Sequence, residues 1–445
     1  MGDPLGDLVP RFPPPRAQDV ADALHARLAR RFVIADVFFE ASEVRAVEAG
    51  DGAAGPSVVR RRGLQLRGVG RDASGTAHTE GLGATEVARA LDGLGLPHRA
   101  APAWPRYRGG LAALDDAVAC ESVERLLAAL RRGAAGAQAA ATLSTRSAAR
   151  AVFRRRGQGA AWREWGWVLR AEVALPDGVV AIGRWGRESA PPDALVDALA
   201  EAVLREREAA LRSATRVGGS VPVVIAAGAS GAALHELVGH SLEADNVLVG
   251  DSSLVAEERV AMEALSVVDD PTPLTEAGGI VIDDEGTPAR AVSLLRAGRV
   301  VGVLHDRVSA ALSDARGAGN GRRADHRGEP APRMRNLVVS PGPDAPDALL
   351  SGIRDGLYVE RLSGWNRAGR FGLAVHAGRR IRAGALAEPV RGALITGAVR
   401  DALAALEGVG CDAAFSAEPL LCEKRGALLT GVAGPTIRFA RMEVS

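Results

Sequence analysis

The sequence predicts an α+β fold built from two domains, an N-terminal α/β domain and a β-rich C-terminal domain. Helical spacing of apolar residues alternates with β-rich runs as far as residue 212. From Val221 onward the pattern changes, and short β-rich runs separated by Gly and Asp turns dominate. The chain has 445 residues, which is long enough for two domains that each bury a core.

The N-terminal domain is expected over residues 17–217, after a Pro-rich, flexible leader at 1–16. Val20, Leu24 and Leu28 recur at four-residue spacing, which is typical of one face of a helix. Pro, Asp and Gly at 176–178 form a turn signal between two β-rich runs. The pattern predicts helices at Ala17–Arg31, Thr85–Leu94, Leu111–Arg132 and Pro191–Arg212, strands at Phe32–Glu40 and Val58–Val69, a hairpin at Trp162–Ile182, and a loop or helix end at Gly133–Ala141.

The C-terminal domain is expected over residues 218–445, directly after the Gly-rich segment at Val217–Gly219. Its first strand is predicted at the apolar run Val221–Ala227, and a short helix follows that strand. Two further helices are expected, at Val308–Ser313 and Arg391–Leu406. The other strands are predicted at Gly279–Ile282, Ala291–Leu295, Val300–Leu304, Leu337–Val339, Gly356–Leu362, Phe371–Ala377 and Ile437–Val444.

Composition narrows the class of protein. The formal net charge is +1, so no bulk field would attract nucleic acid or an anionic membrane. Three cysteines in no framework spacing argue against a disulfide-stapled secreted domain and favour a reducing compartment. The N-terminus lacks an apolar signal core, and the longest apolar stretch is too short to cross a bilayer. These features predict a soluble, cytoplasmic protein with no membrane contact.

The run His235–His240, His-Glu-Leu-Val-Gly-His, is the main candidate for chemistry. Imidazoles bind zinc, and a glutamate beside one ligand can serve as general base to a metal-bound water. On a straight helix, residues five apart point roughly 140° apart, so the two histidines could not face one ion. The spacing therefore predicts a helix that is bulged or broken near Gly239, where glycine tolerates unusual backbone. A chance surface pair is the alternative.

A catalytic zinc usually takes three protein ligands, and the residues themselves leave the third one open. The candidates are Cys120, Cys411, Cys422, the other six histidines and any acidic residue. Cys120 has apolar neighbours in an expected helix, where a buried structural thiol is the default. Cys422 lies at a strand-to-turn junction two residues before Lys424, a cation that would favour the metal-binding thiolate.

Several blocks in one order carry a resemblance to a known family. They are His235–His240 with the following Ser-Leu-Glu-Ala-Asp, the acidic turn Asp283–Pro288, the Gly-Arg loop that begins Gly-Asn-Gly-Arg-Arg at Gly319–Arg323 and continues to Asn336, the strand Gly356–Val359, the strand Ala35–Glu40, and Cys422–Lys424 with Gly431–Thr436. Together they resemble the TldD/PmbA family, the modulators of DNA gyrase. The resemblance covers nearly the whole chain.

The resemblance implies an intracellular zinc metalloprotease of the TldD type. It implies that His235, His240 and Cys422 hold Zn²⁺, that Glu236 acts as general base, and that the metal site lies on a short helix of the C-terminal domain. It also implies unfolded or flexible peptide substrates, including leader or propeptide processing. The implied assembly is a homodimer, or a heterodimer with a TldE/PmbA-type subunit that lacks the zinc motif.

The Gly-Arg loop concentrates Arg322, Arg323, Arg333 and Arg335. The resemblance implies an active-site loop that holds a peptide carboxylate or backbone, with Asn320, Gly321, Arg322 and Arg323 as candidate substrate-binding residues. A solvated loop is an alternative in a chain this rich in arginine. Nucleic-acid binding is another, but no stacking aromatic residues interleave the arginines.

Two other functional classes remain open from the sequence. The chain could be a non-proteolytic scaffold subunit that keeps zinc for structure. It could also be a DNA-associated regulator, although the near-zero net charge argues against this class.

Overall fold

A computed structural model describes residues 16–50, 55–105, 114–154, 158–213 and 217–445. Nearly all of the predicted leader, and the first three residues of the helix expected from Leu111, lie outside the described residues. The fold is a mixture of helices and strands with strands in excess, as the sequence predicts. No helix in the described part of the chain is both long enough and apolar enough to cross a lipid bilayer.

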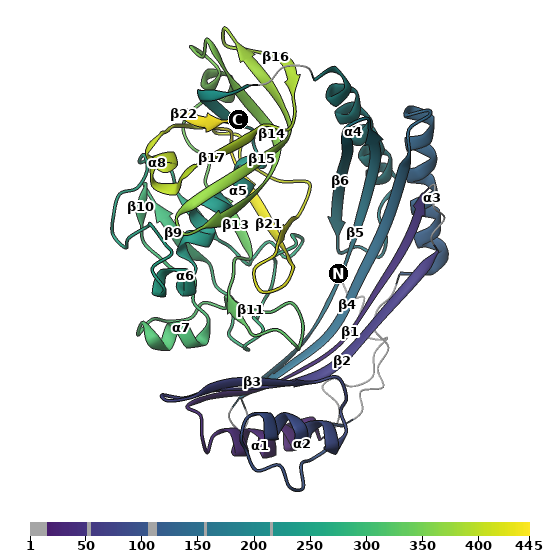
Figure 1. Ribbon diagram of the computed structural model, residues 1–445, viewed down its shortest axis with the longest axis vertical. Coiled ribbons are helices and arrows are strands. Elements are labelled where there is room, and N and C mark those ends of the chain that lie inside the picture. Colours follow the sequence, from purple (N-terminus) through teal and green to yellow (C-terminus); the bar gives the residue numbers. More distant parts are fainter. Residues whose placement is uncertain (1–15, 51–54, 106–113, 155–157, 214–216) are drawn as a thin grey trace.

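The N-terminal half folds into one long antiparallel sheet with four helices (Figure 1). The sheet has six strands in the order β3-β2-β1-β4-β5-β6. Its strands are β1 (Ile34–Gly50), β2 (Pro56–Val69), β3 (Ser74–Thr79), β4 (Ala139–Phe153), β5 (Gly159–Leu175) and β6 (Gly178–Gly186). The helices are α1 (Ala17–Leu28), α2 (Ala84–Gly93), α3 (Asp116–Gly133) and α4 (Asp193–Arg212).

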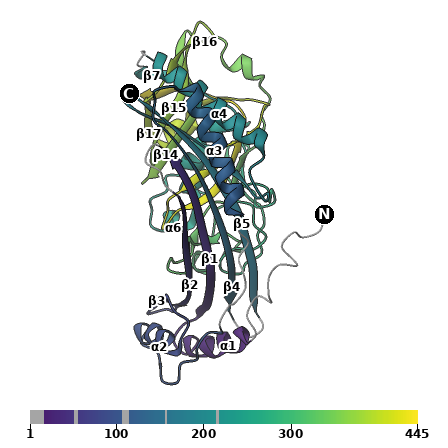
Figure 2. The same ribbon diagram turned by 90° about the vertical axis from the view of Figure 1, so that its right-hand side faces the viewer.

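Two pairs of helices cover the outer face of this sheet at its two ends (Figure 2). Helices α3 and α4 pack together over β4, β5 and β6, where Leu126, Leu130 and Leu199 are fully buried. Helices α1 and α2 pack across the other end. The opposite, inner face of the sheet is turned toward the C-terminal half (Figure 1). Side chains on that inner face therefore take part in contacts between the two halves.

The C-terminal half is built around two sheets. One runs β14-β7-β22-β17-β15-β16 and closes on itself because β14 also pairs with β15. The other runs β10-β9-β8-β13-β21-β19, with β20 on β21. The long strands are β7 (Gly219–Ile225), β14 (Asp355–Arg367), β15 (Arg370–Arg382), β16 (Ala385–Val390), β21 (Leu428–Gly434) and β22 (Ile437–Val444).

The remaining C-terminal elements are short. The strands are β8 (Val267–Asp269), β9 (Val292–Arg296), β10 (Arg299–Val300), β11 (Gly321–Arg322), β12 (Ala331–Pro332), β13 (Asn336–Val339), β17 (Leu394–Ala398), β18 (Leu406–Val409), β19 (Ala414–Phe415) and β20 (Leu420–Cys422). The helices are α5 (Ala229–Leu234), η1 (His235–Gly239), η2 (His240–Leu242), α6 (Ala244–Leu248), α7 (Arg307–Leu312), η3 (Pro346–Leu349) and α8 (Val399–Ala404).

The structure differs from the sequence prediction at a few segments. The end of Gly133–Ala141, expected as a loop or helix end, begins β4, because pairing with both β1 and β5 overrides the weak strand propensity of alanine. Arg391–Leu406, expected as one helix, holds β17 before α8, since Leu394–Ala398 pairs with β15. Gly279–Ile282 is irregular apart from one bridge, and only the start of Val300–Leu304 is a strand.

Buried ion pairs join the two halves. Arg67 on β2 lies 2.5 Å from a carboxylate oxygen of Asp36 on β1 and 2.5 Å from one of Glu285 in the acidic turn. Arg150 on β4 donates to Asp284 of the same turn at 2.9 Å. All five of these side chains are almost completely excluded from solvent. The carboxylates of Asp284 and Glu285 are therefore paired with Arg150 and Arg67 only while the halves stay docked.

We predict that Arg67→Met destabilises the chain strongly. It removes the shared cation and leaves Asp36 and Glu285 buried without their principal partner, which typically costs about 3–5 kcal/mol. Chemical denaturation followed by tryptophan fluorescence would measure the change. Arg125→Met is the matched control, because Arg125 makes ion pairs with Asp193 and Asp197 at the surface and should change the midpoint little. Equal effects of the two substitutions would contradict the prediction.

Candidate metal centre

The helix that carries the His-Glu motif is seated by small residues. After β7 the chain turns at Gly228, whose φ of 77° favours glycine, and enters α5. Every residue of α5 is buried. A Cβ added at Gly231 would lie 2.6 Å from the backbone nitrogen of Ala433 on β21. The Gly/Ala-rich sequence therefore lets this helix approach the sheet closely enough to fix where the motif begins.

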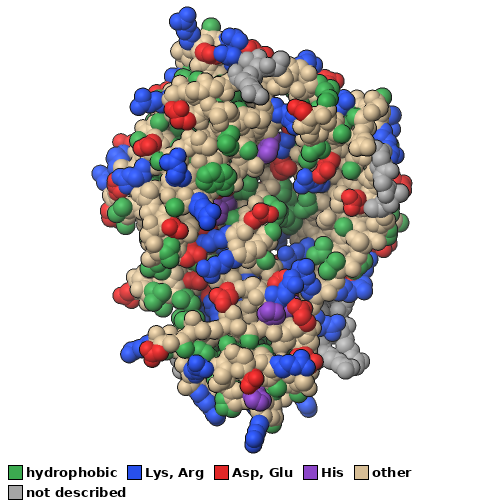
Figure 3. Space-filling model, viewed as in Figure 1, with side chains coloured by type: hydrophobic (Ala, Val, Ile, Leu, Met, Phe, Trp, Pro, Cys, Tyr) green, Lys and Arg blue, Asp and Glu red, His purple; other side chains and the backbone are tan. Residues whose placement is uncertain are grey.

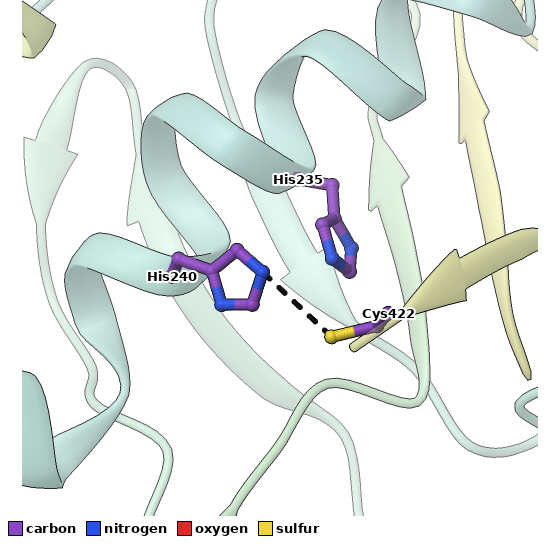
Figure 4. A group of neighbouring side chains, drawn as sticks. All are labelled: His235, His240 and Cys422. Atoms are coloured by element: carbon purple, nitrogen blue, oxygen red, sulfur yellow. Dashed lines mark hydrogen bonds between the residues drawn. The ribbon is translucent and has the colours of Figure 1, made fainter. Parts of the chain in front are cut away.

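The helix widens at the motif, as the histidine spacing predicts. The backbone N–H of His240 donates to the carbonyl of His235, five residues earlier, and residues 235–239 form a π-helical turn. A tighter turn, His240–Leu242, ends the helix. The extra residue brings the two imidazole rings to the same side, with ring centroids 4.8 Å apart and planes at 86° (Figure 4).

Glycine is required at position 239 because of close packing, and not because of an unusual backbone conformation. Its φ of −57° and ψ of −61° are ordinary helical values that any residue adopts. A Cβ at this position would lie 1.9 Å from the sulfur of Met334 in the Gly-Arg loop. The predicted position of the bulge is correct, but the expected reason for the glycine is wrong.

Cys422 completes a group of three side chains. It ends β20, and its sulfur lies 3.7 Å from Nε2 of His240 (Figure 4). The candidate ligand atoms of His235, His240 and Cys422 all lie within 4.8 Å of one another. Among the described residues, this is the one group of three or more His, Cys, Asp or Glu side chains with such geometry. Cys120 lies in α3, and Cys411 is exposed.

The donor atoms fit a metal ion. Both ring nitrogens of His235 are buried, and neither has a hydrogen-bond partner within the described part of the chain. A buried polar atom without a partner is costly, and coordination to a cation would satisfy it. Two imidazoles and a thiolate are ligands that zinc accepts, and a three-ligand set leaves a fourth position for a water or a substrate.

The electrostatics favour the ligating form of the cysteine. Burial alone would raise the pKa of the Cys422 thiol, but the adjacent His235 and His240 outweigh it and lower that pKa to about 4. Burial raises the pKa of the Glu236 carboxyl, against the opposing effect of the two histidines. Lys424, expected to favour the thiolate, instead contacts acidic side chains on the far side of His240.

A charged cluster orients His240. Nδ1 of His240 lies 2.8 Å from Glu243, and Lys424 donates to the same carboxylate oxygen at 2.9 Å and to Asp245 at 2.6 Å. Burial would raise the pKa of Glu243, but His240 and Lys424 lower it to about 2. An ionised carboxylate only accepts hydrogen bonds, so Nδ1 carries a proton and Nε2 is the nitrogen presented to Cys422.

Two more side chains hold the backbone of the centre. Arg333 donates to the carbonyl of Cys422 at 2.5 Å and also to the carbonyls of Lys424 and Gly426. Asn366 donates to the carbonyl of Glu236 at 2.6 Å. Sequence reasoning missed these roles, as it missed Glu243. The three-residue step from His240 to Glu243 was a usable signal, since residues at this spacing are neighbours at a helical turn, and Glu243 directly follows the turn that ends at Leu242.

The four predicted substrate-binding residues lie inside the molecule. Asn320 donates to Asp269 at 2.6 Å, and the backbone N–H of Gly321 donates to Asp283 at 2.9 Å. Arg323 packs on the ring of Phe38, 4.1 Å from its centroid.

Arg322 donates to the carbonyl of Met334 at 2.9 Å and borders a cavity. Arg322, Arg323, Arg333 and Arg335 are all buried, which is incompatible with a solvated basic loop.

Comparisons with known proteins place the chain in a family. Residues 218–445 match the family model of the PmbA/TldA metallopeptidase C-terminal domain. A metalloprotease TldD homolog of Buchnera aphidicola is 29% identical over 232 residues, covering 51% of this chain and 48% of that protein. A zinc metalloprotease TldD homolog of Saccharolobus solfataricus is 30% identical over 238 residues, covering 53% of each chain. The chain spans about half the length of the curated relatives it matches.

A solved structure extends the likeness to the full fold. TldE from Thermococcus kodakarensis superposes with a TM-score of 0.72 at 16% identity, over 95% of this chain and 99% of that one. At this identity the likeness concerns architecture alone. The architecture and the matched C-terminal domain agree with the resemblance carried by the sequence blocks. The chain therefore belongs to the PmbA/TldD metallopeptidase family.

Proposed function

We propose that this chain is a zinc-dependent peptidase that hydrolyses peptide bonds in unfolded or flexible peptides, including leader or propeptide segments. The observation that carries the proposal is the convergence of His235, His240 and Cys422 beside a buried glutamate. The family is one of metallopeptidases, and the name of the Saccharolobus relative includes zinc.

Glu236 is proposed as the general base. Zinc held by His235, His240 and Cys422 would supply Lewis acidity, which lowers the pKa of a bound water and polarises a substrate carbonyl. One carboxylate oxygen of Glu236 is buried, has no hydrogen-bond partner among the described residues and lies 3.9 Å from Nε2 of His240. That oxygen can accept the proton of the attacking water and return it to the leaving amine.

Close packing fixes the direction of this carboxylate. A Cβ added at Gly364 on β14 would lie 2.7 Å from Cγ of Glu236, so glycine leaves the space that the side chain fills. Asn366, two residues further along β14, holds the Glu236 carbonyl. A base held in this way has little conformational freedom to lose in the reaction.

Assembly and location follow the same proposal. The fold shared with TldE supports a homodimer or a heterodimer with a TldE/PmbA-type subunit. Three free cysteines support a reducing compartment, and we place the protein in the cytoplasm.

DNA regulation is disfavoured because the net charge is +1 and the arginines of the Gly-Arg loop are buried. A zinc-containing scaffold without hydrolysis is the competing function.

Metal content tests the ligand set. The purified wild type should contain about one zinc per chain, because three protein donors suffice for a catalytic site. His240→Ala and Cys422→Ala should each lose most of it, measured by elemental analysis after dialysis against a weak chelator. Cys411→Ala removes an exposed cysteine outside the centre and should retain full zinc. Undiminished zinc in Cys422→Ala would refute the assignment.

The variant Glu236→Gln distinguishes a peptidase from a zinc-containing scaffold without hydrolysis. The amide keeps the size of the side chain but does not accept the proton, so zinc content should stay at the wild-type level while cleavage of an unfolded test peptide falls by about 10²–10⁴-fold. Peptide cleavage followed by mass spectrometry provides the measurement. Unchanged cleavage would remove Glu236 from the mechanism, and no cleavage by the wild type, alone or with a partner subunit, would favour the scaffold.

Lys424→Met should weaken zinc binding without removing a ligand. Lys424 fixes Glu243, which in turn orients His240, and loss of such outer partners typically costs about 10–100-fold in metal affinity. Competition with a chromogenic chelator measures that affinity directly. Arg425→Met is the control, because its guanidinium is half-exposed and lies 3.8 Å from Asp245. Equal zinc affinities in the two variants would show that the Lys424 contact does not orient the ligand.

A further inference from the structure

A cavity of about 200 Å³ lies between the inner face of the N-terminal sheet and the C-terminal half. Val168 of β5 and Trp185 of β6 border it on one side, and Arg322 and Leu428 border it on the other. The space-filling view shows the molecule hollowed between these two halves (Figure 3). The volume corresponds to roughly six or seven waters, enough for one large side chain.

This cavity adjoins the metal centre. Leu428 on β21 pairs directly with Cys422 on β20, and directly opposed residues of an antiparallel pair project from the same face, with Cβ atoms roughly 5 Å apart. Arg322 provides a second link, because it donates to the carbonyl of Met334, whose sulfur packs on Gly239 of the π-helical turn. Leu428 and Arg322 therefore link the wall of the cavity to the segments that carry the candidate ligands.

The cavity carries two guanidinium groups without a carboxylate partner. Neither Arg322 nor Arg187 has a carboxylate oxygen within 4.0 Å among the described residues, and each makes one hydrogen bond, to a backbone carbonyl. Burial lowers the pKa of both groups. Glu164, which also borders the cavity, is already engaged by Arg150 at 3.3 Å and by Trp162 at 3.2 Å. The remaining donors of the two arginines are available to a ligand.

The chemistry of the walls restricts that ligand. A buried cation without a partner is costly, and a carboxylate that binds a guanidinium through two hydrogen bonds compensates it. The indole ring of Trp185 and the aliphatic side chains around the arginines favour an apolar group next to the anion. A phosphate has no apolar portion to fill these walls, whereas a residue of a peptide combines an apolar portion with a carboxylate.

We infer that the cavity is a substrate subsite that binds a peptide carboxylate on Arg322, with Arg187 assisting and the adjoining apolar portion packed against Trp185 and Val168. This inference rests on the proposed peptidase function and names its substrate preference. The carboxylate is either the C-terminus of the peptide or an Asp or Glu side chain. Of the four substrate-binding residues that the sequence predicts, Arg322 makes the contact, and Asn320, Gly321 and Arg323 shape the loop that presents it.

The test measures binding on the zinc-loaded full chain carrying Glu236→Gln, so that bound peptide is not consumed. One pair of probes is acetyl-Ala-Ala-Ala-Leu with a terminal carboxylate or a terminal carboxamide. A second pair, both amidated, ends in Glu or in Gln. At least one pair should show about 10–100-fold tighter binding of the carboxylate form, as expected for hydrogen bonds between charged groups. The pair that shows it identifies the source of the carboxylate.

In the Glu236→Gln background, Arg322→Met should bring the ratio of the affinities for the carboxylate and uncharged probes close to one, while the affinity for the uncharged probe is retained. Arg187→Met should reduce the same ratio. Arg170→Met is the matched control, because Arg170 lies on the same sheet at an exposed position paired with Glu172. If Arg322→Met does not fold, Arg187→Met decides by the same ratio. No preference in either pair, no binding of any probe, or a preference unchanged by the deciding variant would overturn the subsite.

Hydrolysis of the same peptides by the wild type distinguishes a failure of the subsite from a failure of the proposed peptidase function. Carboxylate-selective binding without hydrolysis by the wild type would contradict the peptidase and keep the subsite. Hydrolysis without carboxylate selectivity would contradict the subsite and keep the peptidase.

Discussion

The hydrogen bond from the N–H of His240 to the carbonyl of His235 is the interaction on which the candidate metal centre depends. In a regular α-helix these two imidazoles would diverge by roughly 140°. The π-helical turn absorbs one residue and turns both rings toward Cys422, so that the donor atoms of the three side chains come within 4.8 Å of one another. Met334 packs on Gly239, and Asn366 holds the Glu236 carbonyl; these contacts stabilise a turn that is rare without tertiary support.

The polar groups around the candidate metal centre each hold a different part of it. Arg333 holds the backbone of the cysteine segment, Lys424 holds Glu243, and Glu243 sets which nitrogen of His240 faces the centre. Lys424 is the single lysine in a chain that otherwise uses arginine. Its compact ammonium can contact two carboxylates and a backbone carbonyl at once, which the planar guanidinium fork does less well in a confined space. The backbone carbonyls of Cys422, Lys424 and Pro332 and one carboxylate oxygen of Glu243 thereby gain hydrogen-bond partners.

The junction between the two halves serves both stability and recognition. Near one end of the N-terminal sheet its inner face is occupied by matched ion pairs, such as those of Arg67 with Asp36 and Glu285. Beside the metal centre, Trp185 on the same face, Arg187 after β6 and Arg322 on β11 border a cavity, and neither arginine has a carboxylate partner among the described residues. Matched charges hold the halves together, whereas unmatched charges confer affinity for an anionic ligand, because only the latter gain a partner on binding.

The sequence by itself determined the fold class, most helices and long strands, and the family resemblance. These features depend on local periodicity and on ordered motifs. Spacing left the third ligand open, and it was the resemblance that implied Cys422 beside His235 and His240. The sequence did not determine why Gly239 is glycine, that the Gly-Arg loop is buried, or that Lys424 serves His240 rather than Cys422. Those outcomes depend on contacts between segments far apart in sequence, such as Gly239 with Met334 and Arg323 with Phe38. Only the tertiary structure decided them, since the burial and partners of a polar side chain are set by what packs against it.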